Sequence, residues 1–213
     1  MIKVLVLDFD GLIVESEEIK DRAFVEIFPD HPEHHETIMR YHLDHKHLVR
    51  YEKFEHIVTA ILGQPYTEAD RERLAARFSE YTRTRIASCP FVPGAPELLS
   101  WFRGHVPMYL VSATPQEELE PIVESRNLTR YFKRIYGAPH RKADVLREVV
   151  AAEGVEPAET MMIGDSLSDL RAAEAVGAAF VGRKRVDDFS GHDCPVFDDL
   201  FGVRAYLLSR VED

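Results

Sequence analysis

The chain has 213 residues, of which 45% are hydrophobic and 30% charged, and its formal net charge is −11. This composition is typical of a globular protein, and the length allows a main domain plus a smaller one. The acidic balance disfavours non-specific binding of nucleic acid or of an anionic membrane. The two cysteines, Cys89 and Cys194, form no CxxC pair, and neither a leader nor a membrane-length apolar run is evident. We expect a cytoplasmic protein, and the sequence leaves open whether the two cysteines form a disulfide.

Two acids follow the first expected strand. Residues 4–7 form a short apolar run rich in β-branched side chains, which predicts a strand buried on both faces. Asp8 and Asp10 come directly after it, and Gly11 lets the chain turn away. Ligands of open α/β sheets bind outside the carboxyl ends of the strands. Because two close carboxylates repel one another, a cation beside them is the natural compensation.

Helical patterns dominate the next part of the chain. Ser16 is expected to cap a helix with acids in its first turn. Helices are also expected over residues 33–48, over residues 50–62, and after a cap at Thr67. Residues 15–88 are therefore predicted to form a small helical domain inserted after the first strand.

Strand and helix patterns alternate after Cys89. Strands are expected over residues 106–111, 132–136, 160–163 and 178–181 and near Val196. Helices are expected over residues 95–103, from Thr114 and Pro115 onward, and over residues 142–153. Two more helices are expected, one from after Ser166 to Gly177 and a final one through Leu208. This alternation predicts a mostly parallel, doubly wound α/β sheet with right-handed crossovers. Residues 1–14 and 89–213 would form this core.

Four short signatures occur at the ends of expected strands or just before helices. They are Asp8-Phe9-Asp10-Gly11, Ser112, Lys142, and Gly164-Asp165-Ser166-Leu167-Ser168-Asp169. In this order they resemble motifs I to IV of the haloacid dehalogenase-like (HAD) hydrolase superfamily, and the helical insert resembles its C1-type cap. The resemblance covers nearly the whole chain and favours phosphatases similar to β-phosphoglucomutase and phosphoglycolate phosphatase. The composite is far more specific than any single motif.

The resemblance implies roles for the first two acids. Asp8 matches the nucleophile that attacks phosphorus and becomes a transient aspartyl phosphate. A carboxylate is a weak nucleophile, so metal coordination and placement must activate it. Asp10 matches the general acid and base, which protonates the departing alcohol and then takes a proton from water.

Two further residues match phosphate-binding positions. Ser112 matches the motif II hydroxyl that contacts the phosphoryl group, with Ala113 beside it, although a serine that simply ends a strand is equally common. Lys142 matches the motif III lysine, whose charge balances Asp8 and the phosphoryl oxygens. Its neighbour Arg141 is the alternative if the register shifts by one residue.

The motif IV acids imply a metal site. Asp165 is expected to join Asp8 as a ligand, with the backbone carbonyl of Asp10 and water completing the shell. Asp169 would act through water or by orienting Lys142; the alternative is an acid favoured at a helix start. All-oxygen ligands and a phosphate partner suit Mg²⁺.

Motif I departs from the usual family pattern in two places. Leu12 replaces Thr or Val, and Glu15 replaces the usual Asp. Leu12 removes no catalytic group, and Glu15 is expected to be a flap or first-turn residue whose longer side chain shifts the hinging of the cap slightly. Within the family, Asp10 argues against dehalogenases, which lack this second acid, and against phosphonatases, which carry a small residue there.

A basic cluster precedes the helix expected around Tyr51. It comprises His42, His45, Lys46, His47 and Arg50. The region is faintly similar to the substrate-recognition stretch of β-phosphoglucomutase-like caps, which implies that Lys46 and Arg50 contact the distal part of a substrate. The alternative is a solvated helix end.

The leading hypothesis is a Mg²⁺-dependent phosphatase that hydrolyses a small phosphorylated metabolite, with a sugar phosphate favoured. A phosphosugar mutase is the nearest alternative, and a pyrophosphatase a more distant one. A non-catalytic phosphate-binding module of the receiver type would need neither Asp10 nor the helical insert. The sequence leaves monomer and homodimer open.

Overall fold

The computed structural model describes residues 1–46, 48–185 and 189–211. The chain divides into two compact units: unit 1 comprises Met1–Glu15 and Cys89–Asp213, and unit 2 comprises Ser16–Ser88. That unit 1 is a catalytic core and unit 2 a C1-type cap stays a prediction. Among the described residues, no helix has the length and apolar character needed to cross a membrane.

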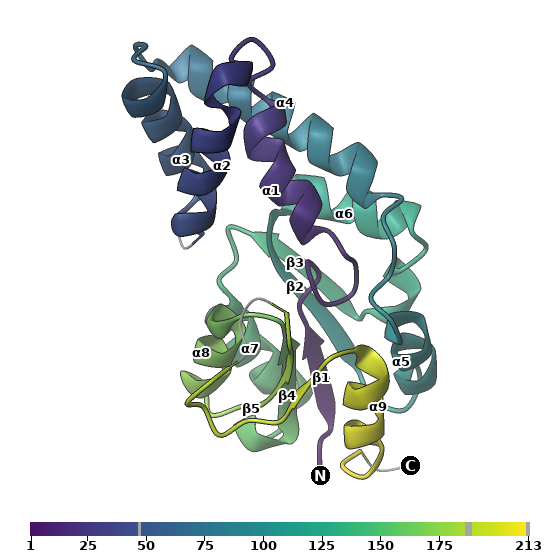
Figure 1. Cartoon of the computed structure of the whole chain (residues 1–213). Helices are drawn as coiled ribbons and strands as arrows, with labels where there is room; N and C mark the ends of the chain where they lie inside the picture. Colours follow the sequence, from purple (N-terminus) through teal and green to yellow (C-terminus); the bar gives the residue numbers. More distant parts are fainter. Residues whose placement is uncertain (47, 186–188, 212–213) are drawn as a thin grey trace. The chain divides into compact units, whose positions relative to one another are not determined.

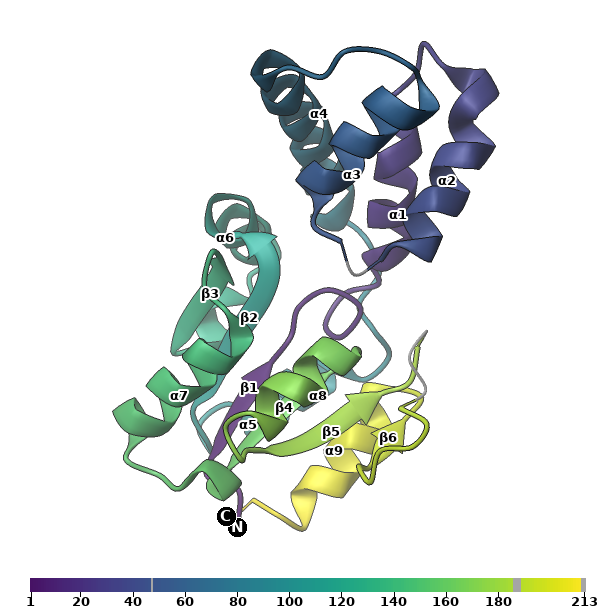
Figure 2. The same ribbon diagram turned by 90° about the vertical axis from the view of Figure 1, so that its left-hand side faces the viewer.

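Unit 1 is built on a six-stranded sheet in the order β3-β2-β1-β4-β5-β6, and every neighbouring pair is parallel (Figures 1 and 2). The strands are β1 (Val4–Leu7), β2 (Met108–Pro115), β3 (Arg134–Ala138), β4 (Thr160–Gly164), β5 (Ala179–Arg183) and β6 (Val196–Phe197). The chain order reverses direction between β1 and β4. The predicted doubly wound α/β sheet is confirmed.

Helices cover both faces of this sheet (Figure 2). One face carries α5 (Ala95–Phe102), α6 (Gln116–Ser125) and α9 (Leu200–Leu208); the other carries α7 (Lys142–Glu153) and α8 (Leu167–Glu174). Short 3₁₀ turns lie at Thr129–Tyr131 and Pro157–Glu159. Successive side chains of a strand point to opposite faces. Val4 and Val6 of β1 accordingly pack with Val145 and Val149 of α7 in one buried cluster.

The helix predicted to start at Thr114 begins later. β2 continues through Pro115, which pairs with Ala138 of β3 after a shift in register. α6 then starts at Gln116. Thr114 does not cap this helix, because its hydroxyl donates a hydrogen bond to Asp10 instead.

Unit 2 is helical (Figure 1). Its helices are α1 (Glu17–Glu26), α2 (His35–Asp44), α3 (Arg50–His56) and α4 (Glu68–Ile86), with a 3₁₀ turn at Pro32–His34 and a π-helical turn at Ile57–Ile61. Phe24, Phe54 and Phe78 form its aromatic centre, with ring centroids 4.9–6.0 Å apart. Buried aromatic rings remove large apolar areas from water, so these three contribute strongly to the packing of the helices.

Helix ends in unit 2 differ in part from the sequence prediction. Thr67 caps α4 as predicted, in a reciprocal capping box with Asp70. Ser16 precedes α1 but makes no side-chain cap hydrogen bond, and its backbone is already helical. The helix predicted over residues 33–48 starts as the Pro32–His34 turn, and α2 ends at Asp44 because His45 leaves the helical conformation.

Candidate active site

Asp8 and Asp165 lie at the point where the strand order reverses. Asp8 follows β1 and Asp165 follows β4, and these strands are adjacent and parallel. The Asp8 amide donates to the carbonyl of Ile163 at 3.0 Å, which fixes its backbone on β4. The ligand site of an open α/β sheet is the crevice at this reversal. The fold therefore presents both carboxylates where a substrate is expected.

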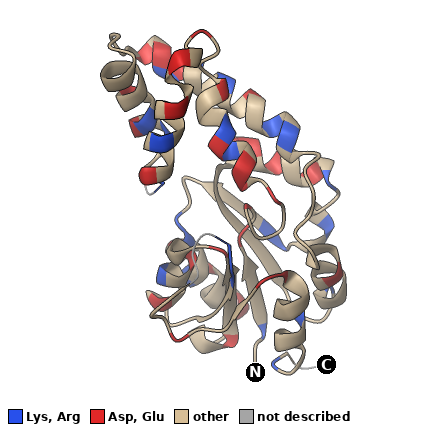
Figure 3. Ribbon diagram, viewed as in Figure 1, with Lys and Arg blue, Asp and Glu red and all other residues tan. Residues whose placement is uncertain are grey.

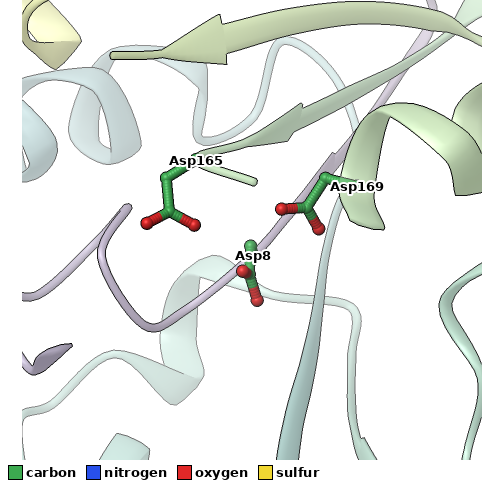
Figure 4. A group of neighbouring side chains, drawn as sticks. All are labelled: Asp8, Asp165 and Asp169. Carbon is green, nitrogen blue, oxygen red and sulfur yellow. The ribbon is translucent and has the colours of Figure 1, made fainter. Parts of the chain in front are cut away.

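Asp8, Asp165 and Asp169 form a buried acidic group (Figure 4). Each offers one carboxylate oxygen, and these atoms lie within 4.8 Å of one another. Asp169 stands in the first turn of α8, where it forms a capping box with Ser166. A Cβ on Gly164 would lie 2.4 Å from the Asp169 Cβ, so only glycine lets Asp169 approach this closely.

Lys142, the first residue of α7, contacts two members of this group. Its Nζ lies 3.0 Å from Asp8 Oδ2 and 2.5 Å from Asp169 Oδ1. Burial alone would lower the pKa of Lys142, but the charges of Asp169 and Asp8 raise it above its usual range. Burial raises the pKa of Asp8 well above normal; the Lys142 charge opposes this, and Asp169 and Asp165 add to it. Arg141, the alternative to Lys142 in this role, is exposed.

The Asp10 carboxylate is held by two hydroxyls of β2. Ser112 Oγ and Thr114 Oγ1 donate hydrogen bonds to Asp10 Oδ2 at 3.0 and 2.9 Å. Both hydroxyls are buried, whereas Ala113 between them is exposed. The sequence prediction did not include Thr114 in the site. Alternation along the strand was the available signal, because residues two apart share a face.

Two arginines also reach the site: Arg183, the last residue of β5, and Arg185, which follows the strand. Arg185 Nε donates to Asp165 Oδ2 at 2.8 Å. The Arg183 guanidinium donates to the Gly11 carbonyl and to the Glu15 carboxylate. The sequence prediction missed both residues, although two arginines two positions apart after an expected strand were a visible signal.

Comparison with known proteins identifies the family. Residues 2–177 match the model of the haloacid dehalogenase-like hydrolases. The chain belongs to this family. Phosphoglycolate phosphatase 1 of Pseudomonas aeruginosa is 33% identical over 116 residues, which cover 52% of this chain and 43% of the relative. The matched stretch thus spans less than half the length of that curated relative.

Solved structures share the fold of this HAD hydrolase. A predicted phosphoglycolate phosphatase from Haemophilus somnus superposes with a TM-score of 0.77 and 18% identity, covering 96% of this chain and 97% of the other. The HAD hydrolase YfnB of Bacillus subtilis, bound to magnesium, gives a TM-score of 0.73 and 17% identity, with 97% and 98% coverage. At these identities the similarity establishes the fold.

The acidic group of this HAD hydrolase fits a hard divalent cation. Its three members offer only carboxylate oxygens, the ligands that Mg²⁺ prefers in proteins. Burial is the first cause of the raised pKa of Asp8, and repulsion from the charges of Asp169, Asp165 and Asp10 adds to it. A cation bound among these oxygens would relieve that repulsion. The Asp10 carboxylate is not part of the group, so Asp10 could contribute through its backbone carbonyl.

The predicted basic residues of unit 2 are engaged within that unit, where basic and acidic residues intermingle along the helices (Figure 3). Lys46 Nζ lies 3.0 Å from the Asp21 carboxylate. The Arg50 guanidinium lies over the rings of Tyr51 and Phe78, at 5.2 and 5.6 Å from their centroids. His47, also in the predicted cluster, lies outside the described residues.

His42 belongs to a buried polar chain beneath Lys46. Its Nε2 lies 2.8 Å from Asp21 Oδ1, and Lys53 Nζ lies 3.1 Å from its Nδ1. The His42 ring also stacks on Phe24, with centroids 4.2 Å apart. Because Lys53 can only donate, Nδ1 accepts and Nε2 carries the proton that Asp21 accepts. His45 lies apart from this chain and bonds the Tyr41 carbonyl.

Proposed function

We propose that this chain is a Mg²⁺-dependent phosphatase that hydrolyses a small phosphorylated metabolite through an aspartyl phosphate on Asp8. The observation that carries the proposal is the contact of Asp8 with Lys142 inside the buried acidic group, at the reversal point of the sheet. A carboxylate, a fixed ammonium and further acids at this point match the requirements of phosphoryl transfer to an aspartate.

Asp8 would attack phosphorus in line with the departing alcohol, forming the bond from one carboxylate oxygen to phosphorus as the ester bond breaks. Lys142 would balance the charge that spreads over the phosphoryl oxygens. Asp169 holds Lys142 in place through its 2.5 Å contact. Mg²⁺, held by Asp8, Asp165 and the Asp10 carbonyl, would supply charge neutralisation and orient the phosphoryl group.

Asp10 would deliver a proton to the departing alcohol and then remove one from the water that hydrolyses the aspartyl phosphate. Both hydroxyls, of Ser112 and Thr114, donate to Oδ2, so we place the transferred proton on Oδ1. The two acids of motif I therefore take different roles because their surroundings differ: Asp8 faces Lys142, and Asp10 faces two hydroxyls.

For the substrate, we propose a small monoester whose distal part is bound by Lys46 and Arg50 of unit 2. Both a sugar phosphate and 2-phosphoglycolate fit this description, the latter supported by the names of the relatives. The test is a panel of phosphorylated metabolites, assayed for phosphate release with Mg²⁺ and with EDTA. Release that requires Mg²⁺ supports the proposal. Formation of an isomer without phosphate release would indicate a mutase, and no turnover of any member would overturn the proposal.

A further inference from the structure

Arg183 ties the end of β5 to the segment that follows Asp10. Its Nη1 donates to the Gly11 carbonyl at 2.6 Å and to Glu15 Oε2 at 3.1 Å, and its Nη2 donates to Glu15 Oε1 at 2.7 Å. The Arg183 side chain is only 10% exposed. A forked contact of this kind fixes both partners in direction as well as in distance.

The segment from Asp10 to Glu15 is a tight loop. The Gly11 amide donates to the Val14 carbonyl at 2.9 Å, and Gly11 has a left-handed backbone, with φ at +69°. Glu15 ends the loop, and its amide donates to the Pro90 carbonyl at 3.0 Å. The two Arg183 contacts therefore hold both ends of the loop at the β5 side.

This loop touches the acidic group directly. A Cβ on Gly11 would lie 2.1 Å from Asp165 Oδ2, so the Gly11 backbone packs against that carboxylate. A small displacement of Gly11 must therefore move the adjacent Asp10, press on Asp165, or both. Such a displacement should move Asp8 less, because the Asp8 amide donates a hydrogen bond to the Ile163 carbonyl of β4.

We infer that Arg183 is a positioning residue for the general acid. Ser112 and Thr114 hold the Asp10 carboxylate, while Arg183 holds the peptide that follows Asp10. Proton transfer to a leaving group requires the acid to be placed to within a fraction of an ångström. Glu15 serves by orienting the guanidinium. This inference rests on the proposed function, since it needs Asp10 to donate a proton.

The test compares two substrates, an alkyl phosphate with a poor leaving group and an aryl phosphate with a good one. The aryl ester needs little proton assistance when its alcohol departs, so its kcat/KM, which covers the steps up to the aspartyl phosphate, depends little on Asp10. In Arg183→Met we expect kcat/KM for the alkyl ester to fall about tenfold more than kcat/KM for the aryl ester. Arg183→Lys should show an intermediate ratio, because one ammonium cannot make both contacts.

A double-mutant cycle tests the part played by Glu15. Glu15→Gln leaves the bond from Arg183 to Gly11 possible, so it should change the alkyl-to-aryl ratio less than Arg183→Met does. If Glu15 acts only through Arg183, the combined variant should match Arg183→Met alone. Additive effects would overturn the stated role of Glu15.

Arg126→Met is the matched control. Arg126 donates to the Cys89 carbonyl at 2.9 Å, so it also holds a backbone carbonyl next to a junction between the two units. We expect this variant to lower the melting temperature and keep the wild-type ratio. If Arg183→Met and Arg183→Lys lose stability but also keep the wild-type ratio, Arg183 is structural and the inference is wrong. If the wild-type chain releases no phosphate from any substrate, the proposed function fails, and the inference with it.

Discussion

The Lys142 ammonium lies 3.0 Å from the Asp8 carboxylate, and both side chains are largely shielded from water. Asp8 directly follows β1 and Lys142 begins α7, so both residues lie near the carboxyl ends of the parallel strands. The Lys142 charge does not keep the pKa of Asp8 at its usual value: this pKa is raised in spite of Lys142. Burial and the neighbouring acids outweigh the single ammonium.

Replacing Lys142 by Met should lower kcat by about 100-fold, because the phosphoryl charge loses its fixed counter-charge. It should also lower the melting temperature, since buried Asp8 and Asp169 lose their partner. The measurements are steady-state kinetics and thermal unfolding. Arg141→Met is the control, because Arg141 is exposed and should tolerate the change. Equal losses of activity in the two variants would contradict the role of Lys142.

Mg²⁺ should raise the melting temperature of the wild-type chain. A ligand that binds only the folded state stabilises it by ~2.7 kcal/mol at about 100 times its dissociation constant. Asp165→Asn should remove most of this shift, since Asp165 belongs to the acidic group. Sodium chloride at matched ionic strength controls for general screening. A full shift in the Asp165 variant would place the cation elsewhere.

Much of this site could be predicted from single strands and turns. Asp8 follows an apolar run, and Lys142 begins a helix whose observed limits equal the predicted ones. Such features depend on neighbours in sequence, so local patterns reveal them. The parallel sheet follows in the same way, from the alternation of strand and helix.

The remainder depends on contacts between distant segments. At Thr114 and Pro115, the pattern of a helix start competes with continued pairing to β3, and the pairing prevails. The predicted strand ended at Val181, two residues before Arg183. Nothing local indicates that Arg183 reaches Gly11, because that contact depends on the pairing of β5 with β4 and of β4 with β1.

The buried chain in unit 2 predicts a pH dependence. Burial lowers the pKa of His42; the hydrogen bond with Asp21 opposes this, and the Lys53 charge adds to it. The folded pKa is therefore below the unfolded value of about 6.5. The unfolded chain binds more protons between these values, so His42 should make stability fall as the pH drops below about 6.5.

This effect can be isolated with His42→Gln. The free energy of unfolding is measured by denaturant titration. Between pH 7 and pH 5 it should fall more steeply for the wild-type chain than for the variant. Nitrogen NMR of the wild-type imidazole at pH 7 should show a neutral ring with the proton on Nε2. A charged His42 at pH 7 would contradict the assigned hydrogen bonds to Asp21 and Lys53.

The basic residues of unit 2 predict a change in selectivity. Lys46→Ala and Arg50→Ala should each lower kcat/KM for the best metabolite by about tenfold, the value of one charged hydrogen bond. A small aryl phosphate has no distal part, so its hydrolysis should be nearly unchanged. The ratio of the two kcat/KM values is the measurement. An unchanged ratio would mean that Lys46 and Arg50 do not contact the substrate and only form a solvated helix end.

The most direct test of the central claim is to trap the phosphoryl group on Asp8. Asp10→Asn should still accept phosphate from an aryl ester, yet hydrolyse the aspartyl phosphate slowly, because the base for water is gone. The variant is mixed with the ester and Mg²⁺ and quenched in acid within milliseconds to seconds. It is then digested, and the masses of its peptides are determined by mass spectrometry. We expect one added phosphoryl group on the peptide that contains Asp8, and none when Asp8→Asn is combined with Asp10→Asn. Release of the aryl alcohol with the Asp8 peptide unmodified at every time point would contradict covalent catalysis by Asp8.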